Sequence, residues 1–223
     1  MSETPRAVIF DMDGVLVASG PAHAASWRLV ARRHGIDVSE QRFRESFGRT
    51  SRDIIATLWG AGLAPDDVER IDADKERTYR ELISGVVPLM IGARETLAAL
   101  AAAGYRLAVA SSGPRENIDL VLDETRIRGS FSAVVTGFDV CRGKPDPECF
   151  LLAARRLGVP PPGCVVVEDA PVGIEAALAA KMGVIGLAGT HPAHRLATAG
   201  AHRVVAALRE ITPALVGQVL AST

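Results

Sequence analysis

The sequence predicts an α/β fold, in which a parallel β-sheet carries helices on both faces and an all-helical cap domain is inserted. Two observations predict this fold. Short, continuously apolar segments alternate with helical patterns, which is typical of parallel strands buried between helices. This alternation is interrupted from residue 21 to residue 84, where the segments have helical patterns only.

Five apolar segments are predicted to be strands, and most of them run directly into polar residues. They cover residues 7–10, 106–110, 133–135, 164–167 and 184–187. The first ends at Asp11, the second at Ser111, and the fourth at Glu168 and Asp169, while Lys144 follows soon after the third. Because ligands bind at the carboxyl ends of the strands in such sheets, we expect these side chains to lie close together.

The helical patterns divide the chain into two predicted units. Those that alternate with the strands cover residues 93–103, 115–123, 147–157 and 173–182, and those of the inserted segment cover residues 22–34, 39–47, 51–59 and 65–82. Glycines separate the inserted helices. We therefore expect a core domain formed by residues 1–16 and 86–223 and a cap domain formed by residues 17–85.

Composition excludes several classes of partner. The 223 residues include 25 Lys and Arg against 26 Asp and Glu, so the formal net charge is −1. This balance gives no general attraction to nucleic acid or to an anionic membrane surface, and no apolar segment approaches the ~20 residues of a membrane helix. We expect a monomer that binds a small molecule at a local site, with no nucleic acid or membrane partner.

The cysteines and the N-terminus indicate a cytoplasmic protein. Cys141, Cys149 and Cys164 show neither C-x-x-C nor Cys/His metal spacing, so they are expected to be free thiols in a reducing compartment. The first six residues lack the cationic and then apolar layout of a signal peptide.

Two carboxylates at the end of the first strand suggest nucleophilic chemistry. Asp11 and Asp13 stand two positions apart in the sequence DMDG. One carboxylate can attack phosphorus as an oxygen nucleophile, and the other can transfer a proton to the leaving oxygen. By itself this short pattern is equally typical of a turn or of a calcium-binding loop.

Four segments in order give this pattern a context. They are FDMDGVL at residues 10–16, AVASS at 108–112, GKPDP at 143–147 and VVVEDAPVGI at 165–174. Together they resemble the four motifs of the haloacid dehalogenase-like hydrolase superfamily. With the helical insertion, the chain is similar to the subgroup of beta-phosphoglucomutases and sugar-phosphate phosphatases. The resemblance implies a Rossmann-like core and an Mg²⁺-dependent reaction at phosphate.

The resemblance also assigns roles at the phosphate. It implies that Asp11 is the nucleophile, that Asp13 is the general acid and base, and that Ser111, Ser112 and Lys144 bind the phosphate. These roles agree with elementary electrostatics. The Asp11 carboxylate and the phosphate are both anions, so positive charge must neutralise their repulsion, and Lys144 supplies one such charge.

The metal ligands implied by the resemblance are acidic. Mg²⁺ would be held by Asp11, by the main-chain carbonyl of Asp13 and by Asp169, and Glu168 would bind it directly or through water. Oxygen ligands of this kind are those that Mg²⁺ prefers. Taken separately, Glu168 and Asp169 are equally typical of a helix cap.

Two residues of the inserted segment are candidates for substrate contact. His23 precedes Trp27 by four positions and therefore shares its buried helical face, where a histidine has either a structural or a substrate-proximal role. Lys75 shares a face with Ile71, Tyr79 and Leu82. It matches a cap lysine that faces the substrate in mutases, or it extends its charged end out of an apolar face.

The choice between phosphatase and mutase depends on a second anion site. Related proteins usually carry Asp-Ser/Thr-Glu after the first motif, whereas residues 18–20 here are ASG. Mutases hold a distal phosphate with a Ser-Lys-Asn set just after the second motif, whereas residues 113–115 here are GPR. Arg115 alone remains there as an anion ligand. Arg49 and Arg52 are further candidates, or exposed arginines at a helix start.

This weaker distal set favours hydrolysis of a small phosphorylated metabolite, first of all a sugar phosphate. A beta-phosphoglucomutase-type mutase is the alternative. A catalytically silent sensor of a phosphorylated metabolite is a third hypothesis, which the intact nucleophile argues against.

Overall fold

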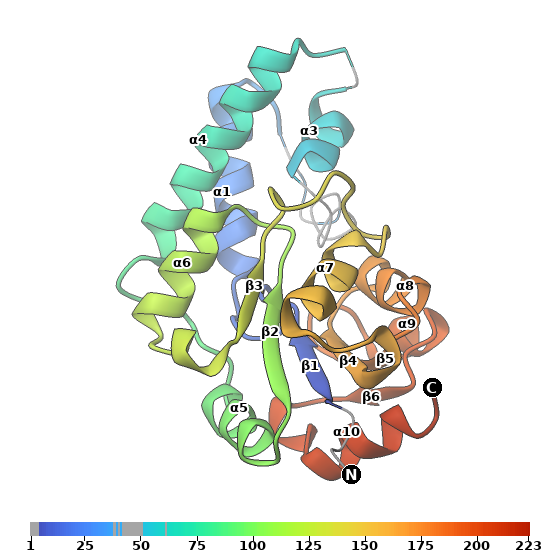
Figure 1. Ribbon diagram of the computed structural model, residues 1–223. Coiled ribbons are helices and arrows are strands. Elements are labelled where there is room, and N and C mark those ends of the chain that lie inside the picture. Colours follow the sequence, from blue (N-terminus) through green and yellow to red (C-terminus); the bar gives the residue numbers. More distant parts are fainter. Residues whose placement is uncertain (1–4, 38, 40, 42–50, 61) are drawn as a thin grey trace.

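A six-stranded parallel sheet forms the centre of the protein in the computed structural model (Figure 1). The structure describes residues 5–223 except residues 38, 40, 42–50 and 61. The strand order is β3-β2-β1-β4-β5-β6. The strands are β1 Ala7–Phe10, β2 Arg106–Ala110, β3 Ala133–Val135, β4 Cys164–Glu168, β5 Gly183–Leu187 and β6 Arg203–Val205.

The register of the sheet brings the carboxyl ends of its central strands together. Phe10 pairs with Val109 on one side and with Val167 on the other. The Asp11 main-chain N–H then donates to the Val167 carbonyl at 3.0 Å, so Asp11 leaves the sheet level with Glu168. Every residue of β1 is fully buried because both faces of this strand are covered.

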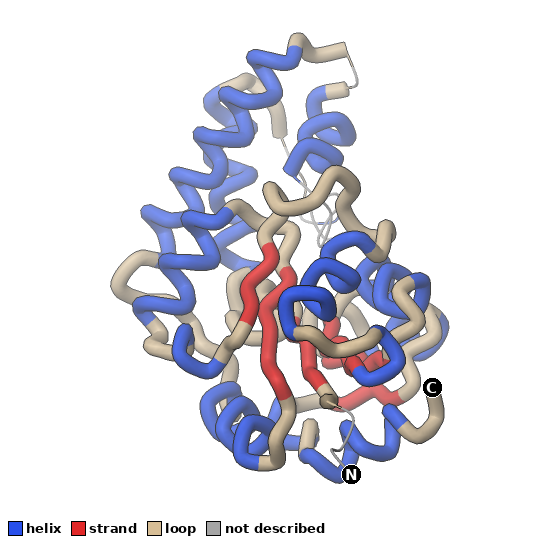
Figure 2. The backbone as a smooth tube through the Cα atoms, viewed as in Figure 1, coloured by secondary structure: helices blue, strands red, loops and turns tan. Residues whose placement is uncertain are grey.

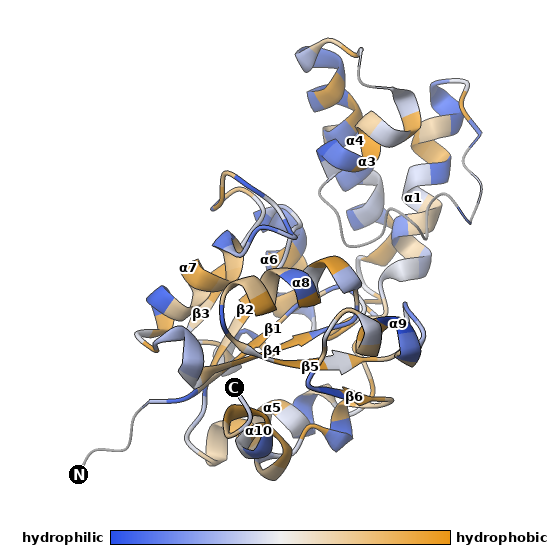
Figure 3. Ribbon diagram, turned by 90° about the vertical axis from the view of Figure 1, so that its right-hand side faces the viewer, coloured by the Kyte–Doolittle hydropathy of each residue, from blue (hydrophilic) through white to orange (hydrophobic). Residues whose placement is uncertain are grey.

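Helices cover both faces of the sheet, as Figures 2 and 3 show. Side chains alternate along a strand: Val8 and Phe10 join an apolar cluster with α5, α6 and α10, whereas Ala7 and Ile9 join one with α7, α8 and α9. These helices are α5 Ala93–Ala102, α6 Arg115–Glu124, α7 Glu148–Leu157, α8 Pro171–Ala179, α9 Ala193–Thr198 and α10 Pro213–Leu220. Short 3-10 turns are η1 Arg128–Ser130, η2 Pro161–Gly163 and η3 Leu208–Glu210.

The predicted α/β fold is confirmed, and each of the five predicted strands lies within two residues of an observed one. The elements β6, α9 and α10 were not predicted from the sequence. β6 is a three-residue strand at the edge of the sheet with Arg203 exposed, so it lacks the continuous apolar pattern of the buried strands. α8 begins two residues before the predicted start because Pro171 fits the first helical turn.

The inserted segment forms a helical unit beside the carboxyl ends of the strands (Figure 1). Its described helices are α1 Gly20–Arg33, α3 Ser51–Trp59 and α4 Pro65–Ile83. Trp27, Ile55 and Ile71 belong to an apolar cluster that these three helices share. The predicted helix at 39–47 lies almost entirely outside the described residues.

Within the described part of the chain, no helix is both long and apolar enough to cross a membrane. The cytoplasmic location and the monomeric state stay predictions from the sequence.

Candidate active site

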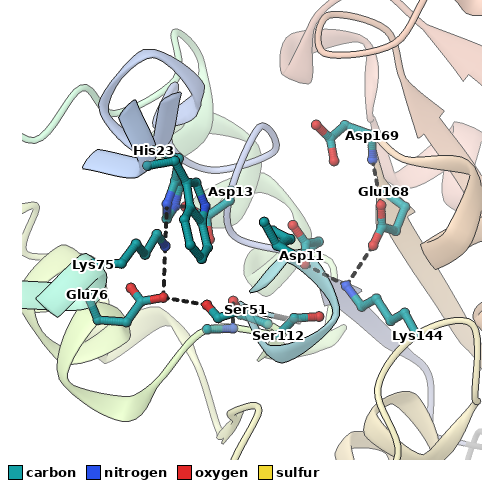
Figure 4. A pocket seen from close by; sticks show the side chains of 14 residues that line it. Asp11, Asp13, His23, Ser51, Lys75, Glu76, Ser112, Lys144, Glu168 and Asp169 are labelled. Carbon is teal, nitrogen blue, oxygen red and sulfur yellow. Dashed lines mark hydrogen bonds and ion pairs between the residues drawn. The ribbon is translucent and has the colours of Figure 1, made fainter. Parts of the chain in front are cut away.

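Asp11, Lys144 and Glu168 form a buried ionic triad at the carboxyl ends of β1 and β4 (Figure 4). The Lys144 ammonium donates to Asp11 Oδ1 and to Glu168 Oε1, both at 2.6 Å. Lys144 is 5% exposed. One cation is therefore shared by two buried carboxylates.

Both oxygens of Glu168 have partners. Oε1 accepts from Lys144, and Oε2 accepts from the main-chain N–H groups of Asp169 and Ala170 at 2.9 Å. Gly173 gives the carboxylate room, because a Cβ atom there would lie 1.8 Å from Oε1. These contacts hold the Glu168 carboxylate beside Lys144, and they leave at least one of its about four acceptor positions for a further ligand.

The triad and its neighbours carry more negative than positive charge. Burial raises the pKa of Asp11 to about 7; Glu168 and Asp13 add to this rise and Lys144 opposes it. Burial, together with Glu168 and Asp11, also raises the pKa of Asp169 well above its usual value. Burial alone would lower the pKa of Lys144, but Asp11 and Glu168 hold it well above its usual value.

Asp169 offers an oxygen that would suit a metal ion. Its Oδ2 atom is buried and has no hydrogen-bond partner. Gly14 brings the main chain against this oxygen, since a Cβ atom on Gly14 would lie 1.9 Å from it. No cluster of three His, Cys, Asp or Glu ligands is preformed among the described residues. The donor set fits Mg²⁺ all the same, because this ion uses one or two carboxylates and completes its shell with water and phosphate oxygens.

Asp13 is directed toward the helical unit. Its Oδ1 atom accepts from Ser19 Oγ at 2.5 Å, lies 3.1 Å from His23 Nε2, and is also within reach of the Tyr79 hydroxyl at 3.4 Å. Burial alone would raise the pKa of Asp13, but His23 and Ser19 lower it to about 2. These contacts therefore stabilise the carboxylate form of Asp13.

The neighbours of His23 fix its tautomer. The Lys75 ammonium lies 3.0 Å from His23 Nδ1 and can only donate, so Nδ1 accepts. The proton is then on Nε2, from which it points at Asp13. The His23 ring also stacks on Tyr79 with centroids 3.9 Å apart. His23 thus connects the helical unit to the end of β1.

A pocket of about 60 Å³ joins these groups. Nine of the predicted residues line it, namely Asp11, Asp13, His23, Lys75, Ser111, Ser112, Lys144, Glu168 and Asp169. Ser111 is buried at the end of β2, and its Oγ accepts from the Gly113 N–H at 3.1 Å. A hydroxyl and main-chain N–H groups at a strand end are well suited to a phosphate.

The predicted arginines lie elsewhere. Arg115 is exposed at the start of α6 and its guanidinium lies 3.5 Å from Asp139, outside the pocket lining. Arg52 is exposed on α3 and lines a neighbouring groove. Arg49 lies outside the described residues. The structure therefore gives no support to Arg115 as a ligand for a second phosphate.

The pocket is also lined by residues that were not predicted as site residues, among them Trp27, Ser51 and Glu76. Glu76 follows Lys75 on α4, and both are buried, whereas Leu82, which was expected on the buried face, is 40% exposed. Ile83 is buried in its place. A carboxylate on the buried side of an amphipathic helix was the signal that could have identified Glu76.

The fold and this site together define an α/β enzyme with its polar centre at the carboxyl ends of a parallel sheet. A family model described as haloacid dehalogenase-like hydrolase matches residues 5–181, and the chain belongs to this family.

Some of the known proteins that are similar to this chain are named phosphatases, and others are named mutases. Validoxylamine A 7'-phosphate phosphatase of Streptomyces hygroscopicus subsp. limoneus is 33% identical over 195 residues, which are 87% of this chain and 91% of that protein. Beta-phosphoglucomutase of Bacillus subtilis is 32% identical over 195 residues, which are 84% of this chain and 85% of that protein. The crystal structure of beta-phosphoglucomutase from Clostridium difficile has a TM-score of 0.89 at 23% identity, covers 98% of each chain, and establishes the fold alone.

Proposed function

We propose that this protein is an Mg²⁺-dependent phosphatase that hydrolyses a small phosphate ester, with Asp11 as the nucleophile. The observation that carries this proposal is the buried Asp11 carboxylate held 2.6 Å from the Lys144 ammonium. Ser111 and Ser112 line the same pocket. A nucleophile, a cation and hydroxyl groups therefore converge at the end of β1, where a phosphoryl group fits between them.

Hydrolysis proceeds in two steps in this proposal. An Asp11 oxygen forms a bond to phosphorus, the ester P–O bond breaks, and Asp13 in its protonated form gives a proton to the leaving alcohol oxygen. Asp13 then accepts a proton from water, which attacks the aspartyl-phosphate, releases inorganic phosphate and restores Asp11. To act as the acid, Asp13 must first bind a proton, which its contacts with His23 and Ser19 oppose.

The metal ion would be held by Asp11, the Asp13 main-chain carbonyl and Asp169. When bound, Mg²⁺ supplies positive charge that offsets the repulsion between carboxylate and phosphate and stabilises charge in the transition state. The unpartnered Asp169 Oδ2 atom supports this assignment.

Asp169→Asn is expected to raise the Mg²⁺ concentration required for half-maximal activity by at least roughly tenfold, since changes even beyond the direct ligands have effects of this size. Activity titrations with Mg²⁺ and calorimetric titration of the protein alone measure this. Glu175→Gln, an exposed change on neighbouring α8, is the control. An Asp169→Asn variant with an unchanged metal titration would remove Asp169 from the ligand set.

Residues 17–85 act as a cap in this proposal. The pocket of about 60 Å³ holds little more than a phosphoryl group, whereas sites for small organic ligands measure about 300–1,000 Å³. In this proposal the helical unit moves away from the strand ends to admit a substrate with a larger leaving group. Its return would exclude water while Asp11 is phosphorylated.

A beta-phosphoglucomutase-type reaction is the second candidate, because a mutase is among the relatives. A mutase must hold two phosphates of a bisphosphate, and Arg115, a candidate ligand of the distal one, is exposed and lies outside the pocket lining. This observation favours hydrolysis.

Phosphate release from a panel of sugar and polyol phosphates with Mg²⁺ tests the choice. We expect free phosphate from one or a few monoesters, with no requirement for a bisphosphate. The diagnostic comparison is the reaction of glucose 1-phosphate with and without a trace of glucose 1,6-bisphosphate. Formation of glucose 6-phosphate with little free phosphate would show a mutase instead.

A further inference from the structure

The helical side of the pocket contains a buried ion pair that the steps above do not use. Lys75 Nζ lies 2.8 Å from Glu76 Oε1, and these residues are 3% and 6% exposed. Figure 4 shows both side chains across the pocket from Asp11 and Lys144. In-line attack by Asp11 requires the leaving oxygen to lie on the opposite side of phosphorus, so the alcohol part of a substrate would extend toward the helical side of the pocket.

Glu76 is held rigidly in this position. Its Oε1 atom accepts from Lys75 Nζ and from Ser51 Oγ, both at 2.8 Å, and its Oε2 atom accepts from Asn117 Nδ2 at 2.6 Å. A carboxylate has about four acceptor positions, so at least one remains for a hydroxyl group of a ligand. Asn117 belongs to α6, so Glu76 also connects the helical unit to the core.

The surroundings of Glu76 suit a neutral, hydroxyl-rich group. Lys75 donates, Glu76 accepts, and Ser51 does both, while Trp27 and Ile54 line the same side of the pocket with apolar surface. Polar groups that both donate and accept, next to an aromatic surface, match the alternating hydroxyl and C–H groups of a sugar or polyol.

A second anionic group would fit poorly here. The charge of Lys75 is already balanced by Glu76, and the described residues that line this side of the pocket include no other lysine or arginine. A second phosphate or a carboxylate would meet a buried carboxylate, and like charges in such a place repel strongly.

We propose that Glu76 is a specificity-determining residue, which selects monophosphate esters of neutral, hydroxyl-rich alcohols against esters that carry a second anionic group. This inference rests on the phosphatase function proposed above. It assigns discrimination to a repulsive element in the pocket, a device that specific sites commonly use.

The test compares kcat/KM for two matched pairs, fructose 1-phosphate with its 1,6-bisphosphate and glucose 6-phosphate with its 1,6-bisphosphate. We expect the wild type to prefer the monophosphate of each pair that it hydrolyses. In Glu76→Gln this preference should fall by about ten- to a hundredfold, chiefly through faster use of the bisphosphate, because Lys75 is then unbalanced.

Two further variants separate charge from structure. Asn117→Ala removes the Glu76 Oε2 hydrogen bond but keeps the carboxylate, so the preference should stay. Glu76→Gln combined with Asn117→Asp restores an acceptor opposite Gln and places the charge beside Arg80, whose guanidinium donates to residue 117 at 2.8 Å. This double variant should fold even if the single one does not, and should show the same loss of preference.

The outcomes are distinguishable. The inference is overturned if the wild type hydrolyses monoesters but the preference is unchanged in folded Glu76→Gln or in the double variant. It is also overturned if Asn117→Ala loses the preference to the same extent. In both cases the phosphatase function remains supported. A wild type that hydrolyses both members of a pair equally well also overturns the inference alone. No phosphate release from any monoester would refute the proposed function, and this inference with it.

Discussion

Asp11→Asn is expected to lower kcat by roughly 10⁴-fold or more, as removal of a catalytic nucleophile does in other enzymes, while the fold persists. The Asn side chain has nearly the same shape and keeps an oxygen for the Lys144 ammonium, which lies 2.6 Å from Asp11 Oδ1. It lacks the anionic oxygen that forms the bond to phosphorus. Circular dichroism and thermal unfolding should therefore change little, whereas phosphate release should disappear.

Asp123→Asn is the matched control for this prediction, because Asp123 is an exposed acid at the C-terminal end of α6 and does not line the pocket. It should retain full activity. Mass spectrometry after rapid quenching supplies an independent readout: a phosphoryl group should appear on the Asp11 peptide of the wild type and be absent in Asp11→Asn. Substantial turnover by Asp11→Asn would contradict the proposed mechanism.

The local sequence pattern was sufficient to predict the site residues that lie at the ends of the strands. Asp11, Ser111 and Glu168 each follow a buried strand, and the carboxyl ends of parallel strands meet at one edge, so their convergence follows from strand identity and chain order. Lys144 could be added because it lies in a motif close after a predicted strand. These positions depend on topology, which the apolar patterns reveal.

The helical side of the site depends on contacts that no local pattern reveals. Arg115, at the start of α6, lies outside the pocket, and its guanidinium is 3.5 Å from Asp139, 24 positions away. The burial of Glu76 depends on Asn117, 41 positions away. Helix periodicity indicates which residues share a face, but the partner that a polar side chain meets across an interface is a tertiary property.

Lys144→Met is expected to reduce both activity and stability. The substitution leaves Asp11 and Glu168, two buried carboxylates that share the Lys144 ammonium at 2.6 Å, without a counter-ion. Removing one partner from a buried ion pair costs about 3–5 kcal/mol, so the Tm of a chain of this size should fall by roughly 10 °C. The lost charge at the phosphate should lower kcat/KM by roughly a hundredfold or more.

Unfolding by denaturant in the presence of EDTA measures the stability effect without a contribution from metal. Adding Glu168→Gln to Lys144→Met is the informative comparison, because it removes one of the two facing charges and retains an oxygen for the N–H groups of Asp169 and Ala170. We expect the double variant to regain a large part of the lost stability and none of the activity. A double variant as unstable as the single one would show that charge repulsion is not the cause. The expected separation would mean that the buried triad is retained for its chemistry, since a less charged arrangement of the same shape holds the fold nearly as well.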